Sequence, residues 1–235
     1  MIKIETIQTA GVMPAIHGMR NAFNSWNKSD SAPIYIADEV TDNMALFDYF
    51  LGDEDKKLAM SLNKAGSSHS KYRRMMIVWA DITAPLYWWK EFDTYRTGVE
   101  KNSCSTMHTI ANKEFNISDF STEHLMSIDD TIEDSSQRTR PIVLQPPTIS
   151  LLHLIQVLNE NRENYLETRD KKYWWQMIQL LPSSYNQTRT VMMSYEALAS
   201  MYRDRKGHKL DEWEEFRKWI EKLEYSDLIT GGEEE

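Results

Sequence analysis

Cysteine is nearly absent from this sequence: Cys104 is the only one among 235 residues. A lone cysteine cannot form an intramolecular disulfide, and the residues after Met1 lack the charged and apolar regions of a secretory signal. Long apolar runs are missing too, because the most apolar stretch, residues 75–89, contains Asp81 and Pro85 and is too short to cross a bilayer. These absences predict a cytoplasmic protein without a transmembrane segment.

Positive charge is also scarce. The chain has 27 Lys and Arg against 36 Asp and Glu, which gives a formal net charge of −9 and a pI near 5.2. Attraction to nucleic acid needs a basic field, so this balance argues against broad nucleic-acid binding, although local arginines can still bind one small anion. We interpret the basic clusters at residues 71–74 and 203–209 as solvated faces of helices.

The common nucleotide and metal fingerprints are missing. There is no G-x-G-x-x-G, P-loop, H-E-x-x-H or C-x-x-C motif. The six histidines never occur three or four residues apart, so the sequence offers no helix-borne metal site, and we expect each of them to be structural or exposed.

Apolar and aromatic residues, in contrast, are plentiful. The chain is 41% hydrophobic and 11% aromatic, with eight Trp and thirteen Met, which is enough to form one substantial core. We expect a single domain over residues 1–230, followed by a flexible acidic tail at residues 231–235. The surplus of aromatic residues, including Trp88, Trp89, Trp174 and Trp175, exceeds what one small core accommodates and predicts an interface between subunits.

Hydrophobic periodicity predicts a mixed α+β chain whose C-terminal half is mostly helical. We expect a first strand that leads into a helix near residues 14–20, and a segment at 70–80 that is either a strand or a buried helix end. We expect residues 111–147 to form a long extended segment that contains a short helix near 121–127. Further helices or apolar segments are expected at 53–65, 85–96, 150–168, 173–181, 191–206 and 211–223, the last burying Trp213, Phe216 and Ile220.

Two segments combine charge with apolar surroundings. The helix expected at 85–96 carries Lys90, Glu91 and Arg96 among aromatic residues, and burying such charges is costly unless they are paired or meet a ligand. The segment 181–190 predicts a polar loop that begins after Pro182 and places Arg189 just before a long helix.

The first of these segments resembles a block of the flavin-dependent thymidylate synthases, the ThyX family. Ala84-Pro85 matches the family's Ala-Pro, and Arg96 falls on the last arginine of its Gln-x-x-Arg-His-Arg motif. Lys90 keeps a basic residue, whereas Glu91 replaces the family's Gln. Thr94 stands in place of its first Arg, and Tyr95 in place of its His.

The resemblance continues after this motif. In the following loop, Asn102 and Ser105 fit the family's Asn and Ser with one inserted residue, and ungapped counting instead places Cys104 on the serine. In the second segment, Arg189 lies within one position of the family's nucleotide-phosphate arginine. Arg205 falls on the arginine that ends the next helix. No single motif is intact, and together the blocks cover about a third of the chain.

The resemblance implies a ThyX-like fold, in which an antiparallel sheet packs with long helices. It also implies a homotetramer and FAD as cofactor, with methylenetetrahydrofolate and NADPH as cosubstrates, for methyl transfer to dUMP or a related pyrimidine deoxynucleotide. The pattern is similar to the divergent members carried by bacteriophages. The implied site residues are Ser105 and Arg205 for catalysis, Tyr95, Arg96 and Asn102 for the cofactor, and Lys90, Glu91, Arg189 and Arg205 for the substrate.

The altered positions keep a second hypothesis open, in which the chain is a catalytically inactive accessory or interaction protein built on the same fold. Glutamine offers both a donor and an acceptor to a uracil edge, whereas the carboxylate of Glu91 offers only acceptors. A thiolate at Cys104 is a further candidate nucleophile, but a lone intracellular cysteine is more often a small packed residue.

Overall fold

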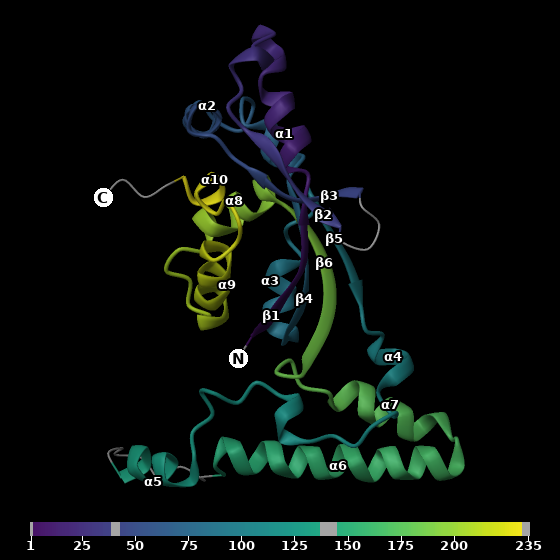
Figure 1. Cartoon of the computed structure of the whole chain (residues 1–235). Helices are drawn as coiled ribbons and strands as arrows, with labels where there is room; N and C mark the ends of the chain where they lie inside the picture. Colours follow the sequence, from purple (N-terminus) through teal and green to yellow (C-terminus); the bar gives the residue numbers. More distant parts are fainter. Residues whose placement is uncertain (1, 39–42, 137–144, 232–235) are drawn as a thin grey trace. The chain divides into compact units, whose positions relative to one another are not determined.

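The computed structural model describes residues 2–38, 43–136 and 145–231 (Figure 1). The strands are β1 Lys3–Ala10, β2 Ala32–Asp38, β3 Asn43–Phe50, β4 Ile77–Pro85, β5 Val99–Ser103 and β6 Asn186–Ser194. The α-helices are α1 Val12–Met19, α2 Asp53–Lys64, α3 Leu86–Phe92, α4 Thr106–Thr109, α5 Ile128–Ser136, α6 Pro147–Thr168, α7 Lys171–Leu180, α8 Tyr195–Asp204, α9 Asp211–Glu221 and α10 Asp227–Thr230. Short 3-10 turns are η1 Asn21–Phe23, η2 Trp26–Lys28, η3 Lys71–Arg74 and η4 Ile117–Asp119.

The strands form two sheets in the described part of the chain. Four strands make one sheet in the order β1-β4-β6-β5, and β2 pairs with β3 in a two-stranded antiparallel hairpin. The hairpin register runs from Ala32 opposite Phe50 to Asp38 opposite Asn43, with a shift between Ile34 and Tyr35. The α+β class expected from the sequence is confirmed.

The chain divides into two compact units, each built from three separate segments. Unit 1 contains residues 1–3, 83–93 and 103–189, and unit 2 contains residues 4–82, 94–102 and 190–235. Strands β1, β4, β5 and β6 therefore each contribute residues to both units. Neither unit is a continuous stretch of sequence, and one domain over residues 1–230 stays a prediction.

The core of unit 1 lies along the long helix α6. Leu151, Ile155 and Leu158 recur at helical spacing on this helix and join a buried cluster with Met177 of α7. The two helices lie side by side (Figure 1). The remaining buried members of the cluster are Ile110, Ala111, Phe115 and Phe120.

The core of unit 2 includes the helix expected near the C-terminus. Trp213, Phe216 and Ile220 are fully buried on α9, as their spacing predicted. On α8, Leu198 and Met201 are also fully buried. Helix α8 begins at a side-chain cap, because the Ser194 hydroxyl accepts a hydrogen bond from the Ala197 N–H at 3.2 Å.

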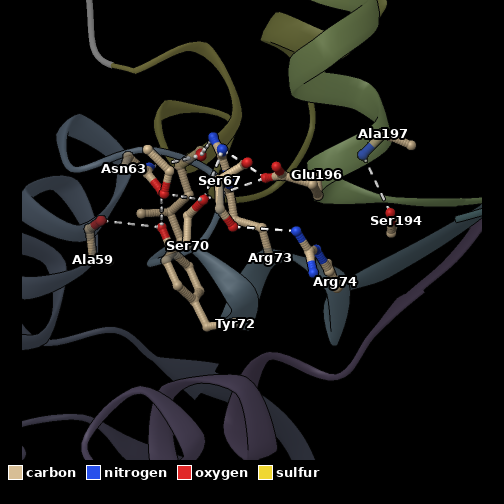
Figure 2. Close-up of polar contacts among 12 residues, drawn as sticks. Ala59, Asn63, Ser67, Ser70, Tyr72, Arg73, Arg74, Ser194, Glu196 and Ala197 are labelled. Carbon is tan, nitrogen blue, oxygen red and sulfur yellow. Dashed lines mark hydrogen bonds and ion pairs between the residues drawn. The ribbon is translucent and has the colours of Figure 1, made fainter. Parts of the chain in front are cut away.

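An arginine of η3 forms a polar network inside unit 2, shown in Figure 2. The Arg73 guanidinium lies 2.6 Å from a carboxylate oxygen of Glu196 and donates to the Ser70 hydroxyl at 3.1 Å. The neighbouring Tyr72 hydroxyl donates to Asn63 Oδ1 at 2.9 Å. Burial raises the pKa of Tyr72, so this phenol stays neutral. The expectation that the basic cluster at 71–74 is a solvated face is wrong for Arg73, whose side chain is only 11% exposed.

A second buried ion pair fixes the start of α2 in unit 2. Arg20 Nε donates to Asp55 Oδ1 at 2.5 Å, and Asp55 Oδ2 accepts hydrogen bonds from the Ser29 hydroxyl and the Ser31 N–H. Burial alone would raise the pKa of Asp55, but the hydrogen bonds from Ser29, Ser31 and Arg20 outweigh it and lower that pKa. The pair is almost fully enclosed, with 6% and 0% of the two side chains exposed.

Several expected element boundaries are wrong. Helix α3 ends at Phe92 instead of residue 96, because the buried aromatic run stops there. Residues 191–194 continue strand β6 instead of starting a helix, with Val191 and Met193 both buried at the two-residue spacing of a strand. Helix α6 begins at Pro147, three residues before the expected start at residue 150.

The short helix expected at 121–127 lies later in the chain, at Ile128–Ser136. The backbone near 121 pairs with another segment, since Phe120 forms a bridge with Tyr185 and the Ser121 N–H donates to the Ser184 carbonyl at 2.9 Å. No helix in the described residues is long and apolar enough to span a membrane.

The Arg20–Asp55 pair predicts a pH-dependent contribution to stability. The folded-state pKa of Asp55 lies below the ordinary 3.8, so its contribution is complete above that value and is lost as the pH falls through the folded-state pKa. We expect Asp55→Asn to lower the free energy of unfolding by about 3–5 kcal/mol at pH 7, because it leaves a buried guanidinium without its counter-charge.

Denaturant unfolding at several pH values between 7 and 3 measures this effect. The difference between wild type and Asp55→Asn should shrink below about pH 4. The matched control is Asp204→Asn, which removes an exposed ion pair with Arg203 and should change stability by less than about 1 kcal/mol. A difference as large at pH 3 as at pH 7 would contradict the prediction.

Candidate functional site

Two arginines expected at a binding site lie in separate clusters, one in each unit. The Arg189 cluster, in unit 1, consists of Trp89, Asp93, Thr106, Gln187 and Arg189. The Arg205 cluster, in unit 2, consists of Tyr95, Arg205 and Trp213.

Helix α3 supplies one side of the Arg189 cluster and is anchored at its start. The N–H groups of Leu86 and Tyr87 donate to the carbonyls of Tyr185 and Ser183, each at 3.0 Å, which satisfies two amides at the helix N-terminus. Its rings Trp88, Trp89 and Phe92 are fully buried and pack at centroid distances of 5.0–5.3 Å. The helix therefore holds Trp89 in a fixed place.

Aromatic contacts and a hydrogen bond fix the loop before β6. Tyr185 packs edge-on against Phe120 at 5.7 Å and against Phe115 at 6.3 Å. Burial raises the pKa of the Tyr185 phenol, which stays neutral. The Ser121 hydroxyl also donates to Asn186 Oδ1 at 2.9 Å, at the first residue of β6. These contacts position the strand that carries Gln187 and Arg189.

The Arg189 guanidinium contacts three residues of the cluster. It lies 4.2 Å from the centroid of the Trp89 ring, and its Nε donates to Gln187 Oε1 at 2.9 Å. Its Nη1 donates to both carboxylate oxygens of Asp93, at 3.0 and 3.2 Å. Arg189 lies on strand β6 and not in the loop that the sequence predicted. Its side chain is 15% exposed, whereas that of Asp93 is 44% exposed.

Gln187 connects Arg189 to the loop between β5 and α4. Its Nε2 donates to the Cys104 carbonyl at 3.0 Å and to the Thr106 hydroxyl at 3.1 Å. The indole N–H of Trp89 donates to the Gln187 carbonyl at 2.9 Å. The same residue thus fixes the aromatic face, the guanidinium and the loop that carries Cys104.

Ser105 and Cys104 lie together in this loop, with exposed side chains. The Ser105 carbonyl accepts from the Thr109 hydroxyl at 2.8 Å and from the Thr109 N–H at 3.0 Å, so Ser105 is the N-cap residue that precedes α4. The Cys104 N–H donates to the Thr188 carbonyl at 3.1 Å. A catalytic role for Ser105 and a nucleophilic role for Cys104 stay hypotheses.

The Arg205 cluster stacks a guanidinium against two aromatic rings. Arg205 lies 4.5 Å from the Trp213 ring centroid and 5.2 Å from that of Tyr95, and its Nε donates to the Tyr95 hydroxyl at 2.9 Å. The two rings are 6.1 Å apart and meet edge to face. Tyr95, the residue in place of the family's histidine, thus positions Arg205 through its phenol oxygen.

The other expected site residues outside the Cys104 loop lie outside the two clusters as defined above. Lys90 on α3 is exposed, and Glu91 beside it is half-buried and interacts with another group. Arg96 and Asn102 are exposed in unit 2. Arg189 belongs to unit 1, whereas Arg96 and Arg205 belong to unit 2, so the convergence of these arginines on one pocket stays a prediction.

The sequence analysis did not identify Trp89, Asp93 and Gln187 as site residues. Their spacing along the chain nevertheless indicates which side chains share a face. Gln187 and Arg189 are two residues apart on a strand and therefore point to the same face. Trp89 and Asp93 are four residues apart and follow each other along one side of α3. Both patterns become informative only once the strand and the helix are known.

The expected surplus of exposed tryptophans is wrong in part. Trp88 and Trp89 are 0% and 1% exposed, because α3 packs both rings inside the protein. Trp175 on α7 is 42% exposed, and its ring packs edge-on against Trp174 at 4.9 Å.

Across the described ranges, no group of three His, Cys, Asp or Glu side chains is arranged to hold a metal ion.

The fold belongs to the class seen in flavin-dependent thymidylate synthases, as the sequence resemblance implied. In particular, the chain resembles the structure of thymidylate synthase X (ThyX) from Helicobacter pylori with FAD and dUMP, with a TM-score of 0.64 and 13% identity. The similarity covers 99% of this chain and 98% of that one. Another structure of the same enzyme, complexed with FAD and dUMP, gives a TM-score of 0.63 and 14% identity over 98% of each chain.

A third similar structure is a UMP/dUMP methylase, PolB from Streptomyces cacaoi, bound with 5-Br UMP. Its TM-score is 0.53 at 12% identity, and the similarity covers 86% of this chain and 75% of that one. No protein-family model and no curated protein sequence matches the chain. At these low identities the comparisons establish the fold.

The position of Trp89 predicts that its ring stabilises the Arg189 cluster. We expect Trp89→Phe to lower the free energy of unfolding by about 1–3 kcal/mol, because it removes the hydrogen bond to the Gln187 carbonyl and weakens the cation–π contact with Arg189. Chemical unfolding monitored by circular dichroism measures the change. The control is Phe23→Leu at Phe23, which is 88% exposed, and it is expected to stay within about 0.5 kcal/mol of wild type. Equal effects for the two variants would contradict the proposed role.

Proposed function

We propose that the chain binds a pyrimidine deoxynucleotide and FAD and transfers a one-carbon unit to the pyrimidine as a methyl group. The observation that carries this proposal is the Arg189 cluster, in which a guanidinium lies over the Trp89 ring and is fixed at Nε by Gln187. A pre-oriented guanidinium is suited to bidentate recognition of phosphate. The ThyX-like fold adds support, since the similar structures contain dUMP or 5-Br UMP.

The proposed reaction moves a one-carbon unit from a reduced folate to the pyrimidine. The methylene carbon of methylenetetrahydrofolate becomes bonded to C5 of the pyrimidine, C5 loses its proton, and tetrahydrofolate leaves. FAD, when bound in its reduced form, supplies the hydride that completes the methyl group, and NADPH is the source of those electrons. The residues of this chain would bind the phosphate, orient the ring and exclude water.

The residues at the expected cofactor positions fit the phosphate groups of FAD. Arg96 and Asn102 have exposed guanidinium and amide groups, which are donors of the kind that bind pyrophosphate. Tyr95 offers an aromatic ring beside Arg205. We therefore assign Tyr95, Arg96 and Asn102 to the cofactor. For the substrate we assign Lys90, Glu91, Arg189 and Arg205, with Ser105 and Arg205 as the catalytic candidates.

One observation favours the second candidate, a ThyX-fold protein without catalysis. Carboxylates stand at Glu91 and Asp93 on or directly after α3, and Asp93 already pairs with Arg189. A negative group at this place opposes the binding of a phosphate. In that case the chain would keep the fold and serve as an accessory or interaction protein.

Binding and turnover measurements separate the two candidates. Calorimetric titration of the purified protein with FAD and dUMP, followed by mass spectrometry of the nucleotide after incubation with FAD, NADPH and methylenetetrahydrofolate, should show binding of both and a methylated product. Arg189→Ala should weaken dUMP binding about tenfold to a hundredfold through the loss of charge-assisted hydrogen bonds. The control Arg203→Ala changes a side chain that is 74% exposed and should leave binding unchanged. Binding without product supports the inactive scaffold, and the absence of FAD and dUMP binding contradicts the proposed enzyme.

We also propose that the protein assembles as a homotetramer. Exposed apolar side chains in unit 1 support an interface there, since Leu152 on α6 and Trp175 and Leu180 on α7 are each more than 40% exposed. A closed symmetric assembly covers identical patches on all copies. Light scattering at micromolar concentration should give four times the chain mass of 27.6 kDa. A strictly monomeric protein would contradict this assembly.

A further inference from the structure

The two members of the ion pair between Arg189 and Asp93 differ in their exposure to solvent. Arg189 is held by Trp89 and Gln187 as well as by Asp93, and its side chain is 15% exposed. Asp93 caps the C-terminal end of α3, and its side chain is 44% exposed. The pair can therefore open by movement of the carboxylate while the guanidinium stays in place.

The support of Arg189 extends beyond its direct neighbours. Gln187, which accepts from Arg189 Nε, is itself fixed by the Cys104 carbonyl and the Thr106 hydroxyl. Its backbone carbonyl accepts from the buried Trp89 indole. This arrangement keeps Arg189 oriented whether or not Asp93 is bound to it.

A carboxylate and a phosphate present similar groups to a guanidinium. Both offer two oxygens to a pair of N–H donors, and a phosphate dianion carries twice the charge. This ion pair is weaker than a fully buried one, because the Asp93 carboxylate is 44% exposed and water solvates it when the pair separates. A dianionic ligand thus has enough attraction to displace Asp93, whereas a neutral nucleoside has none.

We propose that Asp93 is an internal anion that occupies the phosphate-binding edge of Arg189 until a ligand phosphate displaces it. It acts as a specificity-determining residue, because it lowers the affinity of Arg189 for phosphate ligands such as nucleoside monophosphates and leaves the binding of neutral nucleosides unchanged. The identification of the nucleotide rests on the proposed function, but the competition between Asp93 and phosphate at Arg189 does not.

Removing the charge of Asp93 tests this competition. In the full-length protein, Asp93→Asn should raise the affinity for dUMP and for inorganic phosphate about tenfold. A few-fold of this gain comes from the lost ion pair and the rest from lost repulsion of the phosphate. Affinity for deoxyuridine should not change. Asp93→Glu, which restores the charge, should bring the affinities back toward wild type, and Asp93→Ser serves as the neutral variant should Asp93→Asn fold poorly.

Two controls separate this role from a structural one. In Asp93→Asn combined with Arg189→Gln the gain should vanish, because the competition requires the guanidinium. Asp81→Asn changes a carboxylate that accepts from the Thr190 hydroxyl at 2.5 Å and should leave phosphate and dUMP binding unchanged. The melting temperature of Asp93→Asn should stay within about 4 °C of wild type, as expected for a half-exposed pair.

The possible outcomes distinguish this inference from the proposed function. Equal phosphate and dUMP affinities in wild type and Asp93→Asn, or a gain that persists without Arg189, would overturn the role of Asp93 and leave the enzyme proposal standing. Tighter binding of inorganic phosphate by Asp93→Asn, with no binding of dUMP or FAD by either protein, would support the role of Asp93 and overturn the enzyme proposal.

Discussion

The hydrogen bond from the Trp89 indole to the Gln187 carbonyl joins two elements that are almost a hundred residues apart in sequence. Helix α3 provides the ring. Strand β6 provides the carbonyl and also the side chains of Gln187 and Arg189, which lie on one face of the strand. Because the indole is buried, its N–H needs a partner, and the partner it has is the strand that carries Arg189. The orientation of Arg189, its contact with Asp93 and the anchoring of the Cys104 loop all follow from this connection.

Three arginine–carboxylate pairs show how an acidic protein uses its scarce positive charge. In Arg20–Asp55 and Arg73–Glu196 both side chains are at least 83% buried, and several hydroxyl and carbonyl groups complete their hydrogen bonds. Such pairs fix the fold, because losing one partner leaves a charge without compensation. Arg189–Asp93 differs, since its carboxylate is 44% exposed and its guanidinium has other support. Among these three pairs, it is therefore the one suited to exchange its anion for a ligand.

The sequence predicts the α+β class and the buried face of α9, because a stripe such as Trp213, Phe216 and Ile220 is a local pattern. It also proposes Arg189 as a site residue, through a family resemblance in which no motif is intact, and the role of Arg189 stays a prediction. It does not predict that residues 191–194 continue a strand, since a short apolar run fits a strand and a helix equally well. Asp93 and Gln187 are hidden for a related reason: their importance comes from contacts between α3 and β6, and periodicity within either segment does not reveal them.

Both units are discontinuous in sequence, and this affects the order in which the chain folds. Each unit needs three segments of the chain, so its core cannot be completed until residues far apart in sequence have met, and such non-local contacts slow the search for the native state. The pair α6–α7 is an exception, because a two-residue connection joins these helices and most of their shared core is local. This helical hairpin is consequently the part of unit 1 that can form first and offer an apolar surface on which the later-arriving segments condense.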